Sequence, residues 1–246
     1  MKVSIVSATY NSEKSIEACL RSVREQDYPN IEHIVIDGAS KDRTLEILEA
    51  NKAGIGKLIS EKDDGIYDAL NKGIEAATGN VIGFLHSDDL FAHSSVVSHY
   101  VELFKKGFDA VYSDLNYVSG DLKRTIRKWR SGGYKEGMFK RGWMPPHPTF
   151  YVRKEVYAKF GNFNTNLRIS ADYECMLRLI HKEKINVAYL PELSILMRVG
   201  GESNKSLDNR MLANKEDVLA WEMNGLKRPA LTRYLKPLRK IGQFLP

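Results

Sequence analysis

Cysteine is scarce in this sequence, and long apolar runs are missing. Only Cys19 and Cys175 are cysteines, and without a CxxC spacing they offer neither a zinc site nor a redox pair. Both lie in apolar helical patterns, so we expect two reduced core thiols. No stretch approaches the ~18 apolar residues of a membrane helix, and residues 2–6 alternate where a signal peptide would be apolar. We therefore expect neither a membrane span nor a classical export signal.

Four catalytic fingerprints are also missing. The first turn, Ser7-Ala8-Thr9-Tyr10-Asn11-Ser12, contains neither GxxxxGK[ST] nor GxGxxG. The phosphate loop of nucleoside triphosphatases and the dinucleotide fingerprint of dehydrogenases are therefore absent. HExxH and GxSxG do not occur either, which removes the usual signs of zinc proteases and serine hydrolases.

The net charge is positive but does not identify a partner. A formal charge of +6 and a pI of about 9.1 permit phosphate-rich partners, and nucleic acid, anionic lipid and diphosphates all qualify. Outside the last twenty residues the two signs are mixed, with no basic stripe. We therefore expect no nucleic-acid partner.

The chain length of 246 residues supports one large α/β domain with a tail. Short β-rich runs alternate with amphipathic helical stretches, the pattern of a mostly parallel sheet flanked by helices. The predicted strands are Val3–Thr9, Ile31–Asp37, Lys57–Ser60, 81–85 and 110–113, and the predicted helices between them are 13–26, 42–50, 66–77 and 95–106. We assign residues 1–225 to the domain and 226–246 to the tail.

The second half of the domain has a weaker pattern. An irregular strand pair is predicted over residues 115–130, and the glycine-rich, charged segment 131–143 predicts a mobile loop. Helices are predicted at 171–183 and 206–224, because apolar residues recur there at helical spacing.

Polar residues follow several predicted strands, and in an open parallel sheet ligands gather at those carboxyl ends. The sharpest such feature is Asp88-Asp89 after the buried run 81–85. Adjacent carboxylates at a strand end repel each other unless a cation or hydrogen-bond donors compensate them. A hard divalent ion, Mg²⁺ or Mn²⁺, suits oxygen ligands and bridges to phosphates. The alternative is that one aspartate caps the following helix.

Several ordered motifs resemble the family 2 glycosyltransferases of the GT-A fold, including those that build bacterial surface polysaccharides such as O-antigen or capsule. They are Val3-Ser4-Ile5-Val6-Ser7-Ala8-Thr9-Tyr10-Asn11, Val35-Ile36-Asp37-Gly38-Ala39-Ser40, Asp64-Gly65-Ile66-Tyr67-Asp68-Ala69-Leu70-Asn71-Lys72-Gly73, Gly83-Phe84-Leu85-His86-Ser87-Asp88-Asp89, His147-Pro148-Thr149-Phe150 and Ser170-Ala171-Asp172-Tyr173-Glu174. Ordered motifs at plausible spacing are far more specific than any single one.

The resemblance implies a nucleotide-sugar-binding half, residues 1–113, and an acceptor-binding half, residues 114–225. The implied nucleotide-sugar contacts are Thr9, Tyr10, Asn11, Asp37, Gly38, Ser40, Asp68, Asn71, Lys72, Ser87 and Asp88. The implied metal ligand is chiefly Asp89, with Asp88 beside it, and Mn²⁺ or Mg²⁺ is the cofactor. Ser87 stands where the family motif begins with aspartate, which leaves the ligand count open.

Asp172 is the general base that the resemblance implies. It would remove the acceptor hydroxyl proton during a single inverting displacement, with metal charge on the leaving diphosphate. From the residues alone, a cap on the helix that follows is the favoured role of Asp172. His147, Trp143 and Glu174 are candidate contacts for acceptor or phosphate, although histidine and tryptophan also serve as packing residues.

The tail and the acceptor complete the prediction. Residues 227–246 interleave basic and apolar side chains, a composition suited to an anionic bilayer or to packing on protein. By resemblance we expect a UDP-sugar donor, a lipid-diphosphate-linked glycan acceptor, and a cytoplasmic protein at the inner face of the cytoplasmic membrane. A homo-oligomer stays open, as do two other functions: a sugar-phosphate nucleotidyltransferase and a non-catalytic nucleotide-sugar-binding module.

Overall fold

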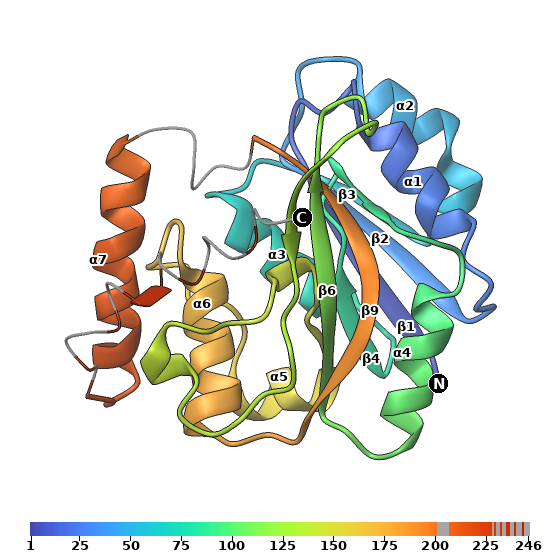
Figure 1. Cartoon of the computed structure of the whole chain (residues 1–246). Coiled ribbons are helices and arrows are strands. Elements are labelled where there is room, and N and C mark those ends of the chain that lie inside the picture. The colour runs from blue at the N-terminus through green and yellow to red at the C-terminus, as the bar shows by residue number, and fades with distance from the viewer. Residues whose placement is uncertain are drawn as a thin grey trace.

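The computed structural model describes residues 1–200 and 207–227, and in the tail Pro229, Thr232, Leu235, Lys236, Arg239 and Gln243. One sheet in the order β3-β2-β1-β4-β8-β6-β9-β5, with β7 paired to β6, forms the centre of the molecule. The strands are β1 Val3–Thr9, β2 Ile31–Asp37, β3 Lys57–Ser60, β4 Val81–Phe84, β5 Asp89–Phe91, β6 Ala110–Val118, β7 Thr125–Trp129, β8 Tyr151–Arg153 and β9 Val187–Arg198. The α/β fold predicted from the sequence is therefore confirmed (Figure 1).

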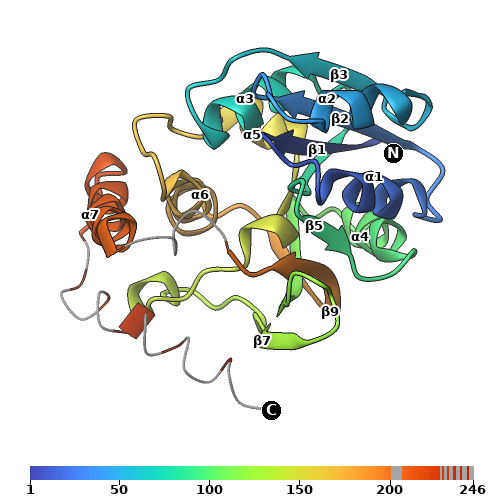
Figure 2. The same cartoon turned by 90° about the horizontal axis from the view of Figure 1, so that it is seen from above.

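Helices cover both faces of the sheet (Figures 1 and 2). They are α1 Ile16–Arg24, α2 Thr44–Ala50, α3 Ile66–Ala76, α4 Val96–Lys105, α5 Lys154–Phe160, α6 Ala171–Met176 and α7 Leu207–Met223. Because side chains alternate along a strand, Val3 and Ile5 pack with α1 and α4, whereas Val6 and Ala8 pack with α3. The apolar strands predicted from the sequence thus form the middle layer.

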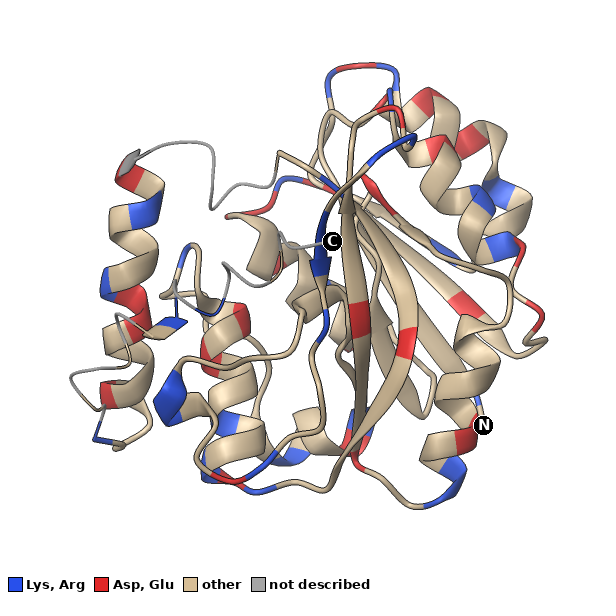
Figure 3. Ribbon diagram, in the orientation of Figure 1, with Lys and Arg blue, Asp and Glu red and all other residues tan. Residues whose placement is uncertain are grey.

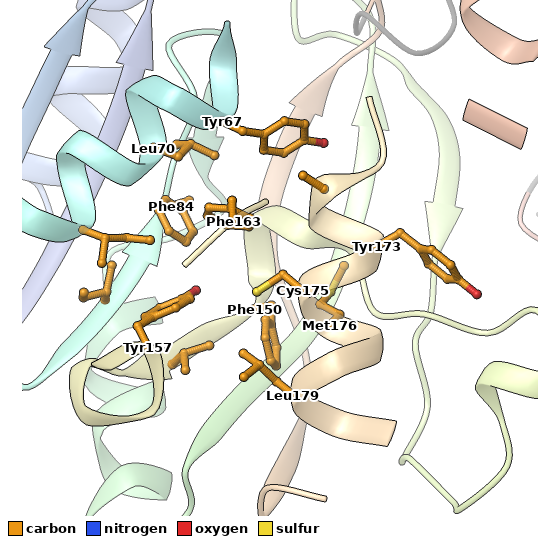
Figure 4. Packing of buried hydrophobic residues seen from close by; sticks show 14 of the residues in the cluster. Tyr67, Leu70, Phe84, Phe150, Tyr157, Phe163, Tyr173, Cys175, Met176 and Leu179 are labelled. Atoms are coloured by element: carbon orange, nitrogen blue, oxygen red, sulfur yellow. The ribbon is translucent and has the colours of Figure 1, made fainter. Parts of the chain in front are cut away.

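Gly73 lets α3 pack closely on β1. A Cβ at this position would lie 2.2 Å from a methyl carbon of Val6. The close approach fixes α3, whose first turn carries Tyr67, against the end of β1. Figure 4 shows Tyr67 and Leu70 of α3 beside Phe84 and Phe163, opposite Cys175 and Met176 of α6. Both cysteines are buried, as predicted.

The sheet contains more antiparallel pairs than the mostly parallel sheet predicted from the sequence. Strands β1 to β4 pair in parallel and so do β6 and β9, but β8 runs antiparallel to β4 and β6, and β5 runs antiparallel to β9. Neither β5, α5 nor β9 was predicted. Strand β9 was missed because its residues are mostly half-buried, without regular alternation.

The predicted mobile loop at residues 131–143 is wrong. Short helical turns at Phe139–Arg141 and His147–Thr149 lie on a packed segment in which Phe139 and Trp143 are buried. The Phe139 and Trp143 rings meet edge to face at 5.4 Å, and Trp143 Nε1 donates to Ser131 O at 2.9 Å. The packing of these aromatic side chains fixes the segment although its glycines favour a flexible loop. The predicted helix 171–183 is present, but its second half, Leu177–Lys182, is a π-helix.

Candidate active site

A cavity of about 1350 Å³ lies where the carboxyl ends of β1 and β4 face the second half of the chain. Most of its wall comes from three parts of the sequence: the β1 and β4 ends with the start of α3, the segment from β7 to the turn at His147–Thr149, and the start of α6 with tail residues. Residues of β6, β9 and α7 also belong to the described lining. Figure 2 shows β1, β2 and β3 above α6 and β7 in the view. The predicted convergence of strand ends is therefore present.

Five of the predicted nucleotide-sugar contacts line this cavity: Thr9, Tyr10, Asn11, Ser87 and Asp88. Tyr10 is 56% exposed, which leaves its ring free to stack on a base. Thr9 Oγ1 is buried and has no hydrogen-bond partner among the described residues. Ser87 Oγ lies 2.9 Å from Ser12 Oγ, which joins the ends of β4 and β1.

Asp37, Gly38 and Ser40 lie beside the cavity wall but are not part of its lining. Asp37 is fully buried and accepts hydrogen bonds from Ser40 Oγ at 2.5 Å and Ser60 Oγ at 2.7 Å. Ser40 Oγ in turn accepts the backbone N–H of Asn11 at 2.8 Å. Asp37 and Ser40 thus support the loop that carries Asn11 through hydrogen bonds.

Asp68, Asn71 and Lys72 of α3 are also outside the lining. Asn71 Nδ2 donates to Phe163 O at 2.9 Å, and Asn71 Oδ1 accepts Phe163 N at 3.0 Å. Lys72 Nζ lies 2.9 Å from Glu61 and 3.3 Å from Asp68. These residues join α3 to neighbouring segments; their predicted nucleotide contact stays a prediction.

The Asp88-Asp89 pair is divided between the cavity and the core. Asp88 lines the cavity, and its carbonyl accepts Arg198 Nη1 at 2.8 Å. Asp89 begins β5 and is fully buried, yet neither of its carboxylate oxygens has a hydrogen-bond partner in the described chain. Burial, and next the charge of Asp88, raises the pKa of Asp89 well above its usual range. Such a carboxylate lacks the compensation that a buried charge requires.

This donor set fits a hard divalent cation. Two carboxylates are available, and Mg²⁺ or Mn²⁺ commonly takes its other ligands from water and substrate phosphates. Among residues 1–200, 207–227 and the six described tail positions, no group of three or more His, Cys, Asp or Glu side chains is arranged to hold a metal ion. Any ion bound here would therefore depend on the donor phosphates for part of its shell.

Asp172 faces the same cavity from the start of α6. Its Oδ1 accepts the Tyr173 N–H at 2.7 Å and the Tyr67 hydroxyl at 3.1 Å. Burial raises the pKa of Asp172, while the Tyr173 N–H, Lys236 and Tyr67 act to lower it. A carboxylate whose pKa is raised toward the working pH is suited to accept a proton.

Glu216 of α7 holds the turn that precedes Asp172. Its two carboxylate oxygens accept the backbone N–H groups of Arg168, Ile169 and Ser170, each at 2.8 Å. Glu216 is 4% exposed, and charge-assisted bonds of this kind are the stronger ones. Sequence reasoning missed this residue because the contact spans more than forty positions and no local pattern signals it.

Glu174 does not line the cavity. It pairs with Arg178 at 2.9 Å and accepts Asn224 Nδ2 at 2.9 Å, so it joins α6 to the end of α7. Glu174 points away from the cavity because residues two positions apart in a helix, such as Asp172 and Glu174, point to different sides. Its predicted acceptor contact has no support from this placement.

His147 and Trp143 both line the cavity. His147 stacks on Phe84 with ring centroids 5.4 Å apart and lies 5.6 Å from His86. Burial, followed by the proximity of His86, lowers the pKa of His147 to about 3, so the ring is neutral. Its Nε2 is buried and has no hydrogen-bond partner among the described residues. Trp143 is 3% exposed and contributes mainly a packed wall.

Tail residues reach the cavity as well. Lys236, Arg239 and Gln243 belong to its lining. Lys236 Nζ lies 2.6 Å from Asp217 of α7 and 3.9 Å from the centre of the Tyr173 ring. Gln243 Oε1 accepts Arg127 Nε at 2.6 Å. These described tail positions pack on the domain, and most other tail residues lie outside the described chain. No described helix is both long and apolar enough to span a bilayer.

The sequence was compared with known families and proteins. The profile of the family described as glycosyl transferase family 2 matches residues 4–183. An uncharacterised glycosyltransferase of Mycobacterium tuberculosis is 33% identical over 187 residues, covering 72% of this chain and 68% of that protein. A PGL/p-HBAD biosynthesis glycosyltransferase of Mycobacterium bovis is 26% identical over 216 residues, covering 85% of this chain and 82% of that protein.

Solved structures share the fold at low sequence identity. The mannosyltransferase PcManGT from Pyrobaculum calidifontis, in complex with GDP-Man and Mn²⁺, has a TM-score of 0.68 and 19% identity, covering 97% of this chain and 69% of that one. S. aureus TarS 1-349 in complex with UDP-GlcNAc has a TM-score of 0.65 and 19% identity, covering 96% and 70%. This chain spans 41% of a longer TarS chain. At such identity these likenesses concern the fold alone.

The family predicted from the ordered motifs is thus confirmed, and it favours a sugar transferase over the nucleotidyltransferase and the non-catalytic binder. The profile match covers more than half of the chain. This protein belongs to glycosyl transferase family 2.

Proposed function

We propose that this glycosyltransferase inverts the anomeric centre as it moves a sugar from a nucleotide-diphosphate donor, by default a UDP-sugar, to a hydroxyl of a glycan acceptor. The observation that carries the proposal is that Asp88 and Asp172 face one cavity from its two halves. A phosphate-side carboxylate and a separate base are what a single displacement needs. A covalent nucleophile is not required.

The base step follows from the contacts of Asp172. In the described chain both hydrogen bonds to this carboxylate reach Oδ1, which leaves Oδ2 for the acceptor hydroxyl. The hydroxyl proton passes to Asp172 as the acceptor oxygen bonds to the anomeric carbon and the bond to the diphosphate breaks. An α-linked donor therefore gives a β-linked product.

Metal dependence is part of the proposal. Asp89, with its unpartnered carboxylate oxygens, and Asp88 would hold Mn²⁺ or Mg²⁺. When bound, such an ion supplies positive charge to the departing diphosphate. Support comes from the carboxylate pair, and from the Mn²⁺ in the complex of PcManGT, whose fold this chain shares.

The acceptor we propose is a lipid-diphosphate-linked glycan at the inner face of the cytoplasmic membrane. The support is the composition of residues 227–246, which interleave basic and apolar side chains suited to an anionic surface. Vesicles with and without phosphatidylglycerol test this by cosedimentation. We expect the full chain to sediment only with the anionic vesicles, and the chain without residues 227–246 to stay in the supernatant. If the full and the shortened chain sediment to the same extent, attachment through these residues is contradicted.

The decisive experiment measures nucleoside diphosphate released from UDP-, GDP- and dTDP-sugars, with Mn²⁺, Mg²⁺ or EDTA. Asp172→Asn should lower kcat by ~10²–10⁴-fold, the usual contribution of a general base, with little change in nucleotide binding. Asp89→Asn should remove the metal response. Glu155→Gln is the matched control, because Glu155 is an exposed carboxylate on α5. Full activity in Asp172→Asn would refute the base assignment, and unchanged rates in EDTA would refute the metal requirement.

A further inference from the structure

The charges that line the cavity are segregated between its two halves. On the wall built by residues 114–246, the described lining carries the cations Arg127, Lys128, Arg130, Arg168, Lys236 and Arg239 and a single carboxylate, Asp172. The wall built by residues 1–113 has the opposite balance. Its charged lining consists of Glu13, Asp42, Asp63 and Asp88, with Lys14 as the cation.

Three of the cations on the second wall are not compensated. Lys128, Arg168 and Arg239 are exposed, and in the described chain none of them has an ion pair with a carboxylate. Arg130 is only loosely paired, at 3.7 Å from Asp114 with half of its side chain exposed. Figure 3 marks the Lys and Arg positions of the described chain in blue and the Asp and Glu positions in red.

The cations come from segments far apart in the chain. Lys128 lies on β7, Arg168 lies in the turn before α6, and Arg239 lies in the tail. Gathering like charges at one cavity costs free energy through mutual repulsion. A neutral sugar would not offset this cost, whereas a group with more than one negative charge would. A single carboxylate would neutralise only one of the three.

We propose that Lys128, Arg168 and Arg239 form the subsite that binds the phosphate of the acceptor while its sugar hydroxyl reaches Asp172. The inference rests on the proposed function, which supplies a phosphate-bearing acceptor, and adds the residues that select it. Arg168 is placed for this because the backbone of its turn is fixed by Glu216. The tail is then part of the acceptor site.

The donor diphosphate is the competing occupant of these cations. It would have to lie away from Asp88, which lines the other wall, and from the adjoining Asp89. The competing assignment predicts that removing the cations weakens nucleotide binding, whereas ours predicts that nucleotide binding is unchanged.

The test uses calorimetric titration of the full chain with three probes in the presence of UDP. The probes are hexyl diphosphate N-acetylglucosamine, hexyl N-acetylglucosaminide 6-phosphate and the neutral hexyl N-acetylglucosaminide. The first two distinguish phosphate in the lipid linkage from phosphate on the sugar. Each of Lys128→Gln, Arg168→Gln and Arg239→Gln is compared with Lys123→Gln and Arg141→Gln, since Lys123 and Arg141 are exposed cations outside the cavity lining.

We expect at least one phosphate probe to bind about tenfold more tightly than the neutral probe, with the difference shrinking as salt is raised. Each cavity variant should bind that probe roughly three- to tenfold more weakly than wild type, while its affinity for UDP stays unchanged. The two control variants should bind the probe as tightly as wild type. Equal binding of charged and neutral probes, or no binding of any of them, overturns the inference. Loss of UDP affinity in the cavity variants overturns it in favour of the donor. If wild type does not bind any nucleotide, the proposed function itself fails, which is a separate result.

Discussion

At the scale of single residues, Asp172 is not the cap of α6 that the residues alone favour, because Ser170 stands at the cap position and no side-chain hydrogen bond caps the helix. Asp172 Oδ1 instead accepts the N–H of Tyr173 within the first turn. The same side chain lines the cavity. Because the Tyr67 hydroxyl also donates to Oδ1, Tyr67 would position the proposed base.

Replacing Tyr67 by phenylalanine should raise the pKa of Asp172 further, because a donor that favours the carboxylate is lost. The acidic limb of the pH profile of kcat should move to higher pH, since Asp172 must be deprotonated to act. On the acidic limb we expect kcat to be roughly two- to tenfold lower than in wild type at the same pH, the effect of one hydrogen bond. Rates at high pH should approach wild type.

Rates of diphosphate release across the pH range check the Tyr67→Phe prediction. Tyr28→Phe serves as the control, because the Tyr28 hydroxyl donates to Met1 O and is not part of the cavity lining. An unchanged acidic limb in Tyr67→Phe would show that the tyrosine does not influence the base.

At the scale of elements, α7 positions the first turn of α6. Glu216 accepts three backbone N–H groups there, while Asn224 and Arg178 bind Glu174 on α6. Trp221 Nε1 donates to the Tyr173 hydroxyl at 2.9 Å. The side of the cavity formed by α6 is therefore only as rigid as the α6–α7 contact.

Glu216→Gln should destabilise the protein and slow transfer together. The amide has a single acceptor oxygen and places an N–H₂ group among backbone donors, so we expect a loss of about 1–3 kcal/mol in the free energy of unfolding. Because Asp172 would be misplaced, kcat should fall while the KM for the donor changes little. Urea denaturation and steady-state kinetics measure the two effects, with the exposed Glu222→Gln on the same helix as control. Wild-type kcat at reduced stability would limit Glu216 to a folding role.

At the scale of the whole molecule, buried neutral histidine makes stability depend on pH. Burial lowers the pKa of His33 from 6.5 to about 4. Its contribution is therefore fully present above pH 6.5 and is lost as the pH falls toward the folded value. The raised pKa values of Asp89 and Asp172 act in the opposite sense, because protonation relieves their burial.

His33→Gln tests this dependence. A glutamine can keep a hydrogen bond to Ser7, which lies 3.0 Å from His33 Nε2, but it does not titrate. Between pH 7.5 and 5 the variant should lose about 2 kcal/mol less of its free energy of unfolding than wild type. Urea denaturation at the two pH values measures the difference. Parallel losses in both proteins would mean that His33 is not the group responsible.

The sequence by itself determined the layered fold, the family and the edge of the cavity at the ends of β1 and β4. These rest on local patterns: alternating strands, helical stripes, and polar residues directly after strands such as Thr9 and Asp88. Each can be recognised within about ten residues, because the periods of strand and helix are short. The bounds of β1, β2 and β3 were predicted correctly for this reason.

Only the tertiary structure decided which of the predicted residues face the cavity. Asp37, Asn71 and Glu174 instead bind neighbouring segments. Lys236 and Glu216 contact the start of α6 from far along the chain, and Arg239 of the tail lines the same cavity. The packed segment 131–143 and strand β9 likewise depend on partners distant in sequence. Such contacts are set by side-chain packing and charge between elements, and no local period in the sequence encodes them.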